Sequence, residues 1–247
     1  SLCLVGKSIT FDSGGLSLKP SKSMDTMKLD MAGGATVLGI FQILSKLTDS
    51  LIGPVYGILP ACENMPSGKA TRRGDIVRAM NGKTIEIVDT DKEGRLILAD
   101  GIAYAVSLGV DEIIDVATLT PEAALALGQE YTALMSNNDA LVNKISIAGS
   151  KCGEEMWRLP LHKNYRLHIG SSYADIQNSG ATAMIGDIVG TQAGAVFLEN
   201  FVADKPWAHL DISGSGWSNP ILEAVYGLSG PPGVGVRTFV NYLIDQG

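Results

Sequence analysis

The sequence contains few of the side chains that build disulfide frameworks or zinc–thiolate sites. Its three cysteines, Cys3, Cys62 and Cys152, lie far apart and form no Cys-x-x-Cys pair. This odd number and scattered spacing argue against a disulfide framework and against a thiolate metal site. They are typical of reduced, buried thiols, so we expect a cytoplasmic protein.

The chain also lacks an excess of basic residues and lacks long apolar runs. Its 19 Lys and Arg residues are outnumbered by 26 Asp and Glu residues, which gives a formal net charge of −7. That charge provides no net attraction for nucleic acid or for an anionic membrane. No apolar run approaches the ~18 residues that span a bilayer, and no signal-peptide layout opens the chain. We therefore expect neither nucleic acid nor a membrane as a partner.

The composition is that of a globular protein. The 247 residues are 45% hydrophobic and 18% charged, which is enough to bury a core. No linker rich in Pro, Gly and Ser divides the chain, so we expect one domain over residues 1–247. The chain begins with Ser1 and passes at once into the buried-strand pattern of residues 2–5. From this start we expect a portion of a longer protein.

Short apolar runs alternate with segments of helical periodicity, which is the pattern of an α/β domain. We expect a mixed, mostly parallel sheet sandwiched between helices. The expected strands are residues 2–5, 52–59, 84–88, 113–117 and 207–212. The expected helices are residues 37–47, 96–106, 139–148, 192–202 and 236–244. Thr120 followed by Pro121 predicts the start of one more helix.

Two glycine-containing loops hold acidic and basic side chains directly after predicted strands. One covers residues 5–15 and continues to residue 30, and the other covers residues 88–96. In an open α/β sheet, ligands bind in the loops beyond the carboxyl ends of the strands. Four hard oxygen donors occur there, which favours two divalent cations over one: Asp12, Asp30, Asp91 and Glu93. For each residue taken alone, the alternative is a solvated acidic turn.

Gly6-Lys7-Ser8 has the ending of a phosphate-binding P-loop. That motif requires another glycine five residues before its second glycine, and Ser1 occupies this position. The residues after Ser8 look extended and looped, whereas a P-loop leads directly into a helix. We therefore reject a nucleotide-binding loop.

Residues 89–96 resemble a known family signature. They read Asp-Thr-Asp-Lys-Glu-Gly-Arg-Leu, and the leucine aminopeptidase (cytosol aminopeptidase) family has Asn-Thr-Asp-Ala-Glu-Gly-Arg-Leu. Further segments similar to that family follow the same order, at residues 59–68, 81–86, 117–120, 157–161 and 207–212. The resemblance covers essentially the whole chain. It is to the C-terminal catalytic domain of the family, whose members carry a further N-terminal domain.

The resemblance implies a metal-dependent aminopeptidase, a hydrolase that attacks the first peptide bond with a hydroxide bridging two metal ions. The ions would be zinc or manganese, with magnesium as an alternative, at the carboxyl ends of the strands. By motif position, the metal ligands would be Lys7, Asp12, Asp30, Asp91 and Glu93. Lys19 would stabilise the charge that develops on the carbonyl oxygen. Arg95 would hold a bicarbonate that relays a proton.

The same resemblance implies a substrate and an assembly. Met27, Thr118 and Leu119 would bind a peptide with a free N-terminus, and the chains would form a homo-oligomer, a hexamer. Pro121 stands where the family usually has glycine, and it has no N–H with which to hold the peptide. Residues 212–216 are small and polar, so leucine selectivity does not follow. The alternative is a non-catalytic relative that acts as a binding or structural protein.

Three large side chains carry no chemistry in this interpretation. His209 lies in the middle of a predicted strand, and we expect a core histidine there and not a metal ligand. Trp157 and Trp207 are expected to serve packing.

Overall fold

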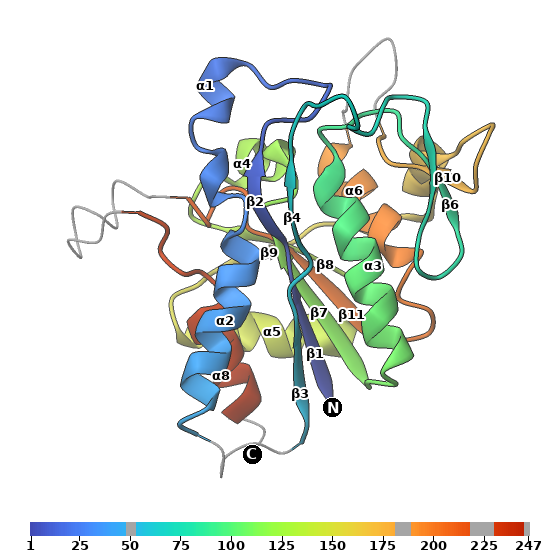
Figure 1. Cartoon of the computed structure of the whole chain (residues 1–247). Helices are drawn as coiled ribbons and strands as arrows, with labels where there is room; N and C mark the ends of the chain where they lie inside the picture. The colour runs from blue at the N-terminus through green and yellow to red at the C-terminus, as the bar shows by residue number, and fades with distance from the viewer. Residues whose placement is uncertain (48–52, 181–188, 218–229, 245–247) are drawn as a thin grey trace.

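The fold is seen in a computed structural model that describes residues 1–47, 53–180, 189–217 and 230–244. In these residues a six-stranded sheet forms the centre (Figure 1), in the order β3-β1-β7-β11-β8-β9. Its strands are β1 (Leu2–Gly6), β3 (Val55–Ile58), β7 (Glu112–Ala117), β8 (Thr132–Ser136), β9 (Met156–Arg158) and β11 (Trp207–Asp211). Strands β8 and β11 pair antiparallel, and the other described neighbours pair parallel. The expected mixed, mostly parallel sheet is confirmed.

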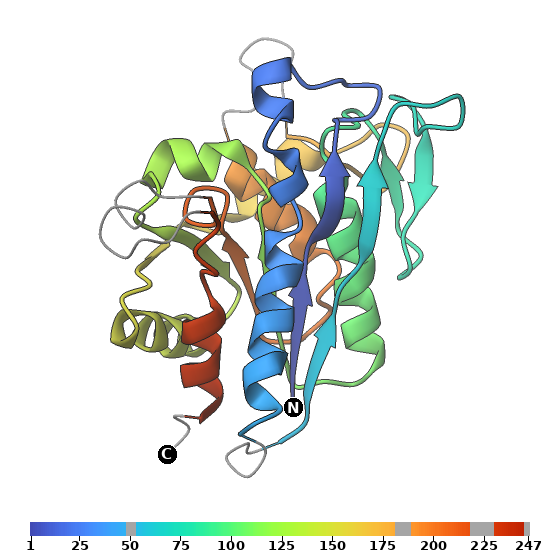
Figure 2. The same ribbon diagram turned by 60° about the vertical axis from the view of Figure 1, so that its left-hand side comes forward.

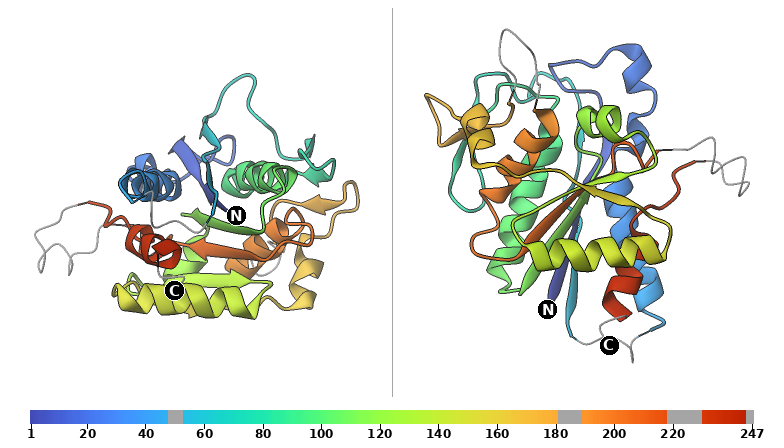
Figure 3. Two further views of the ribbon diagram at one scale, coloured as in Figure 1. Left: turned by 90° about the horizontal axis from the view of Figure 1, so that it is seen from below. Right: turned by 180° about the vertical axis from the view of Figure 1, so that it is seen from behind.

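Helices cover both faces of this sheet, as the views in Figures 2 and 3 show. On one face pack α2 (Ala32–Leu44), α5 (Asp139–Lys151) and α8 (Val236–Ile244), and on the other pack α3 (Glu93–Ser107) and α6 (Gly190–Glu199). The alternation of β1 divides its side chains between the two layers. Leu2 and Leu4 pack with α2 and α8, whereas Cys3 and Val5 pack with α3 and α6. Because both faces are buried, β1 carries only apolar residues and glycine.

Shorter elements lie toward the carboxyl ends of the central strands (Figure 1). The helical ones are α1 (Ser21–Met24), α4 (Pro121–Leu127) and the 3₁₀ helices η1 (Met27–Leu29) and η3 (Lys163–Ile169). A two-stranded sheet is formed by β2 (Ser8–Asp12) and β4 (Ala61–Asn64). A three-stranded sheet is formed by β5 (Ile76–Arg78), β6 (Thr84–Glu86) and β10 (Ile176–Gln177). Lys7 alone separates β1 from β2. One extended segment therefore leads from the core into the loops above it.

Differences from the expected elements have local causes. Residues 8–12 are expected to form part of a loop, but the structure has strand β2 there, because β4 supplies a partner from far along the chain. Strands β8 and β9 also lie outside the expected set. Helix α2 begins at Ala32, ahead of the expected start at residue 37, and includes Gly33. Position 33 has to be glycine, because a Cβ there would collide with the backbone of Val116. Of the expected strand 52–59, residue 52 lies outside the described residues.

Two expectations about single side chains are wrong. Cys3 is buried as expected, but Cys62 is exposed and Cys152 is half-buried. Trp157 is 57% exposed and lies edge-on against Tyr131, because β9 is an edge strand of the central sheet. Trp207, in contrast, is fully buried, and its role in packing is confirmed.

One stretch of the described chain, Ser21–Leu44, is by length and composition alone apolar enough to cross a membrane. It is composed of α1, η1 and α2. Helix α2 has 13 residues, which span ~20 Å, less than the ~30 Å of a bilayer core. Its buried side chains, among them Val37 and Ile40, pack on β1 and β7. The apolar character of α2 is therefore explained by the core of this domain.

A buried polar group links the two central strands β7 and β11. The Asp115 carboxylate accepts a hydrogen bond from Trp207 Nε1 at 2.7 Å and pairs with His209 Nδ1 at 2.6 Å, and all three side chains are fully buried. Burial opposes the charged form of His209, but the Asp115 carboxylate outweighs it and raises the pKa of the imidazole. His209 is thus the core histidine that the sequence predicts.

We predict that Asp115→Ala lowers the free energy of unfolding by about 3–5 kcal/mol, because it leaves a buried imidazole and a buried indole N–H without their partner. Urea unfolding followed by circular dichroism measures this change. The exposed Asp204 offers a control, since Asp204→Ala should stay within about 0.5 kcal/mol of the parent protein. A loss below about 1 kcal/mol for Asp115→Ala would contradict a stabilising role for the pair.

Candidate functional site

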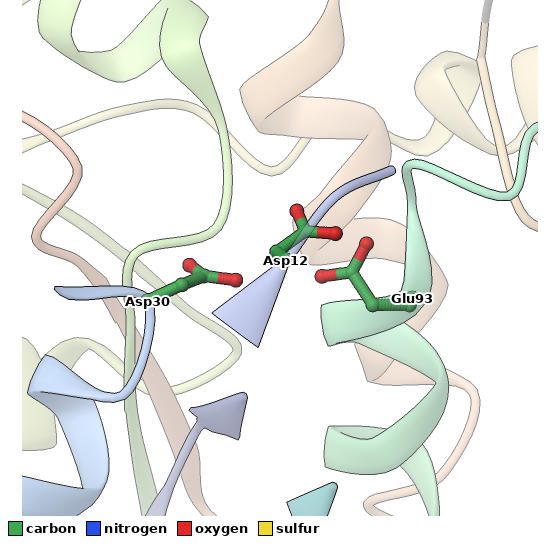
Figure 4. A group of neighbouring side chains, drawn as sticks. All are labelled: Asp12, Asp30 and Glu93. Atoms are coloured by element: carbon green, nitrogen blue, oxygen red, sulfur yellow. The ribbon is translucent and has the colours of Figure 1, made fainter. Parts of the chain in front are cut away.

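Four acidic side chains predicted as metal ligands gather beyond the carboxyl end of β1. Asp12 ends β2, Asp30 follows η1, and Glu93 opens α3 two residues after Asp91. Figure 4 shows Asp12, Asp30 and Glu93 pointing toward one another from these three segments. We call these four residues the carboxylate cluster. Its position agrees with the expected site at the carboxyl ends of the strands.

The members of the carboxylate cluster are unequally buried. Oxygen atoms of Asp12, Asp30 and Glu93 lie within 4.8 Å of one another, and all three side chains are buried. Asp91 is partly exposed. It is linked to the other members through Lys19, whose Nζ lies 2.6 Å from Asp91 Oδ1 and 2.9 Å from Asp12 Oδ2. Lys19 therefore joins the two loops that the sequence singled out.

Lys7 lies inside the cluster. Its Nζ donates to Asp30 Oδ1 at 2.8 Å and to the Thr118 carbonyl oxygen at 2.9 Å, and it lies 3.2 Å from Glu93 Oε1. Burial alone would lower the pKa of this amine, but the carboxylates of Asp30 and Glu93 outweigh burial and raise the pKa. Lys7 is thus an ammonium group in this structure.

Negative charge is crowded in the cluster, because four carboxylates outnumber the two ammonium groups of Lys7 and Lys19. Burial raises the pKa of Asp30 to about 7 although Lys7 opposes the shift. Burial likewise raises the pKa of Asp91 to about 6 against the effect of Lys19. A divalent cation would relieve this repulsion, and hard carboxylate oxygens are its preferred ligands. The residues present therefore fit divalent cations.

The loop after β2 is shaped by glycine and by Thr90. Gly14 and Gly15 both have positive φ, 86° and 65°, which other residues adopt only with strain. The Thr90 hydroxyl donates to the Gly14 carbonyl oxygen at 2.6 Å and accepts from the Ser17 N–H at 2.8 Å. These bonds hold the first loop against the residue that precedes Asp91.

Two asparagines that the sequence analysis did not single out complete this framework. Asn178 is fully buried, and its Oδ1 accepts from the N–H groups of Val88 at 2.9 Å and Asp89 at 3.2 Å. Asn64 ends β4 and donates its side-chain amide into the carboxylate cluster. A sequence signal existed for Asn64 alone, which falls within the family-like segment 59–68.

A cavity of about 590 Å³ opens beside the cluster. The three residues expected to bind substrate, Met27, Thr118 and Leu119, all line it, as do Lys7 and Lys19. Two further walls are formed, one by the β7–α4 loop with α4 and one by the loop after β11, with these lining residues: Pro121, Ala124, Leu125, Ser213, Gly214 and Trp217. Pro121 occupies the first position of α4 after the N-cap Thr120, as the sequence predicts.

Arg95 lies behind the cavity and not on its lining. The side chain is 1% exposed, and its Nη1 donates to the Asn178 carbonyl oxygen at 2.9 Å. Its guanidinium lies close to Gly194 of α6, which also approaches the Leu119 side chain. The bicarbonate expected at Arg95 stays a prediction.

Asp211 joins the two walls of the cavity. Its buried carboxylate accepts from the Leu119 N–H at 3.1 Å and from the Thr120 hydroxyl at 2.6 Å on one wall. On the other wall it accepts from the N–H of Ser213 at 3.1 Å and from the hydroxyl of the same residue at 2.7 Å. One side chain thus fixes the spacing between the β7–α4 loop and the loop after β11.

The sequence profile described as the cytosol aminopeptidase family, catalytic domain, matches residues 1–240. The chain belongs to this family. This match confirms the family resemblance that the sequence segments named above indicate. The family is named for aminopeptidases, a class of hydrolase, and the carboxylate cluster lies in the part of the chain that matches its catalytic domain.

Individual cytosol aminopeptidases show how much of the family this chain covers. The probable cytosol aminopeptidase of Solibacter usitatus is 44% identical over 244 residues, which cover 99% of this chain and 49% of that protein. The probable cytosol aminopeptidase of Desulforapulum autotrophicum is 46% identical over 249 residues, which cover 98% of this chain and 46% of that protein. The chain therefore spans about half the length of the curated relatives that it matches.

A solved structure shares the fold. The bottromycin maturation enzyme BotP in complex with Mn has a TM-score of 0.88 and 41% sequence identity to this chain. The match covers 99% of this chain and 53% of the BotP chain. The mostly parallel α/β architecture is therefore the one found in this part of the family's solved structures.

We predict that Asp211→Ala loosens both walls of the cavity, because the amides of Leu119 and Ser213 lose their shared acceptor. Hydrogen–deuterium exchange at these two amides should become about tenfold faster, as expected when one hydrogen bond is lost. Asp204→Ala should leave both rates unchanged. Parental exchange rates in Asp211→Ala would show that other contacts hold the walls.

Proposed function

We propose that this chain is the catalytic part of a metal-dependent aminopeptidase that releases the N-terminal residue of peptides. The observation that carries the proposal is the carboxylate cluster, whose four carboxylates outnumber the two ammonium groups that pair with them. Membership of the cytosol aminopeptidase family and the presence of Mn in the related BotP complex support it.

The residues that would hold the metal ions are Lys7, Asp12, Asp30, Asp91 and Glu93. Two divalent cations, zinc or manganese with magnesium as an alternative, would supply an activated hydroxide and polarise the scissile carbonyl. Lys7 can act as a ligand only after losing a proton, because an ammonium group has no free electron pair. The Lys7 amine would lose this proton more easily beside a bound dication, whose charge opposes that of an ammonium group.

Lys19 is the residue best placed to assist at the carbonyl oxygen. It lines the cavity beside the cluster, and two carboxylates hold its Nζ in place and raise its pKa against the effect of burial. A fixed ammonium group of this kind stabilises an oxygen that becomes negative. We propose that Arg95 binds bicarbonate, because a guanidinium group binds planar oxyanions through two parallel hydrogen bonds.

The cavity would orient the substrate by its two ends. At the carboxylate end, a metal ion held by the cluster would bind the free, neutral α-amine of a peptide, which would restrict the enzyme to free N-termini. Met27, Thr118 and Leu119 would contact the N-terminal side chain. Pro121 lines the cavity without an N–H to offer, and the small residues Ser213 and Gly214 line it as well. We therefore propose a preference that is not restricted to leucine.

Assembly and location are proposed on the family relationship alone. We propose a homohexamer located in the cytoplasm. The alternative is a non-catalytic relative. It predicts that Lys7 and Lys19 stay paired with the carboxylates and that no metal ion replaces these ion pairs. Metal binding and turnover distinguish the two.

We predict that the full chain binds two divalent ions and hydrolyses aminoacyl amides, and that chelation abolishes both properties. Elemental analysis counts the ions, and release of the amine with zinc, manganese or magnesium measures turnover. Activity should return when the metal is restored. A chain that binds no metal after supplementation, or that hydrolyses none of a set of aminoacyl amides, would contradict the proposal.

We predict that Lys19→Met lowers kcat by about 10²–10³-fold, because it removes one electrostatic contact to the developing oxyanion. The number of bound metal ions should stay at the parental value. Lys22→Met is the matched control, since Lys22 is exposed on α1 three residues away and should keep full turnover. Parental kcat in Lys19→Met would remove Lys19 from the reaction.

A further inference from the structure

Asn64 is not among the expected metal ligands, but it contacts several parts of the site. It ends β4, and the parallel pairing of β2 with β4 places it opposite Asp12. Its carbonyl oxygen accepts from the N–H of Ser13 at 2.9 Å and from the Ser13 hydroxyl at 2.6 Å. The backbone of Asn64 is therefore fixed to the residue that follows Asp12.

The side chain of Asn64 reaches three segments of the site. Its Nδ2 lies 2.9 Å from Asp12 Oδ1, 2.9 Å from the Thr90 carbonyl oxygen and 3.3 Å from Glu93 Oε2. All three neighbours are acceptors, so the amide nitrogen, and not the amide oxygen, must face them. One amide thus connects the end of β2, the loop before Asp91 and the first turn of α3.

The contacts divide the oxygens of each carboxylate. Asp12 Oδ1 accepts from Asn64 and from the Gly14 N–H at 2.9 Å, whereas Asp12 Oδ2 faces Lys19. Glu93 Oε2 faces Asn64, whereas Glu93 Oε1 faces Lys7. In both residues the Asn64 amide contacts one carboxylate oxygen, and a lysine ammonium group contacts the other.

An amide is suited to this position because it donates hydrogen bonds without carrying charge. A lysine or arginine here would add a positive charge that repels cations, and an aspartate would have no hydrogen to donate. Groups that orient metal-binding carboxylates from outside commonly affect metal affinity strongly. We propose that Asn64 is a positioning residue that orients Asp12 and Glu93 for divalent cations, an inference that rests on the proposed function.

The test is a titration of the full chain with Mn²⁺, followed by the electron paramagnetic resonance signal of the unbound ion. The measurement reports affinity and stoichiometry without any turnover. Asn64→Ala should bind Mn²⁺ about 10–100-fold more weakly than the parent protein. Asn64→Leu, which restores side-chain volume without the amide, should show the same loss and serves if Asn64→Ala does not fold.

Asn138→Ala is the matched control. Asn138 caps α5 through its side chain, which accepts from the Leu141 N–H at 2.9 Å, and no contact of Asn138 in the described residues involves the cluster. Its replacement should lower the thermal midpoint by roughly 2–4 °C and leave Mn²⁺ affinity unchanged. A thermal melt of each metal-free variant places the variants on one scale of stability.

The outcomes separate this inference from the proposed function. Parental Mn²⁺ affinity in Asn64→Ala or Asn64→Leu overturns the role of Asn64 and leaves the proposed function intact. An equal loss of affinity in Asn138→Ala also overturns it, because the effect would follow stability alone. A parent protein that binds no Mn²⁺ overturns both.

Discussion

The crowding of four carboxylates around two lysines beyond the end of β1 is the constraint on which the site depends. Like charges this close repel strongly where water is excluded. The surrounding chain therefore has to hold them by other means. Lys7 and Lys19 neutralise part of the charge, and the remaining contacts come from uncharged donors such as Asn64 and the Gly14 N–H. Neutral donors fix the carboxylates without neutralising them, which keeps the cluster attractive to cations.

The cavity wall depends on a second polar group, which runs along one face of β11. Trp207, His209 and Asp211 alternate along the strand and therefore share a face. The first two share the buried Asp115, and Asp211 accepts from both walls of the cavity. The wall that contacts substrate in our proposal is thus anchored in the sheet core. A buried polar group of this kind is rigid because each lost bond leaves an unpaired partner in the interior.

The sequence predicts the parts of this molecule that depend on local pattern or on a specific motif. Asp12, Asp30 and Glu93 were found from their loops and their family-like neighbours, and the structure brings them together. Strand β2 was not predicted, because its stability depends on pairing with the distant β4. Asn64 is marked only by its place in the family-like segment 59–68, and its role is not evident there, since a single asparagine at a strand end more often forms a turn. The burial of Arg95 is likewise a tertiary property that no local pattern encodes.

The two ends of the cavity differ in how tightly the fold constrains them. At the carboxylate end, Asp12, Asp30 and Glu93 are buried and each contacts at least one fixed donor. At the far end, α4 has seven residues, of which Ala123 is the buried one, and Leu125 is 85% exposed on the cavity rim. Substitutions on α4 can therefore reshape the cavity without moving a carboxylate. Changes in substrate preference can accumulate there while the chemistry at the other end stays the same.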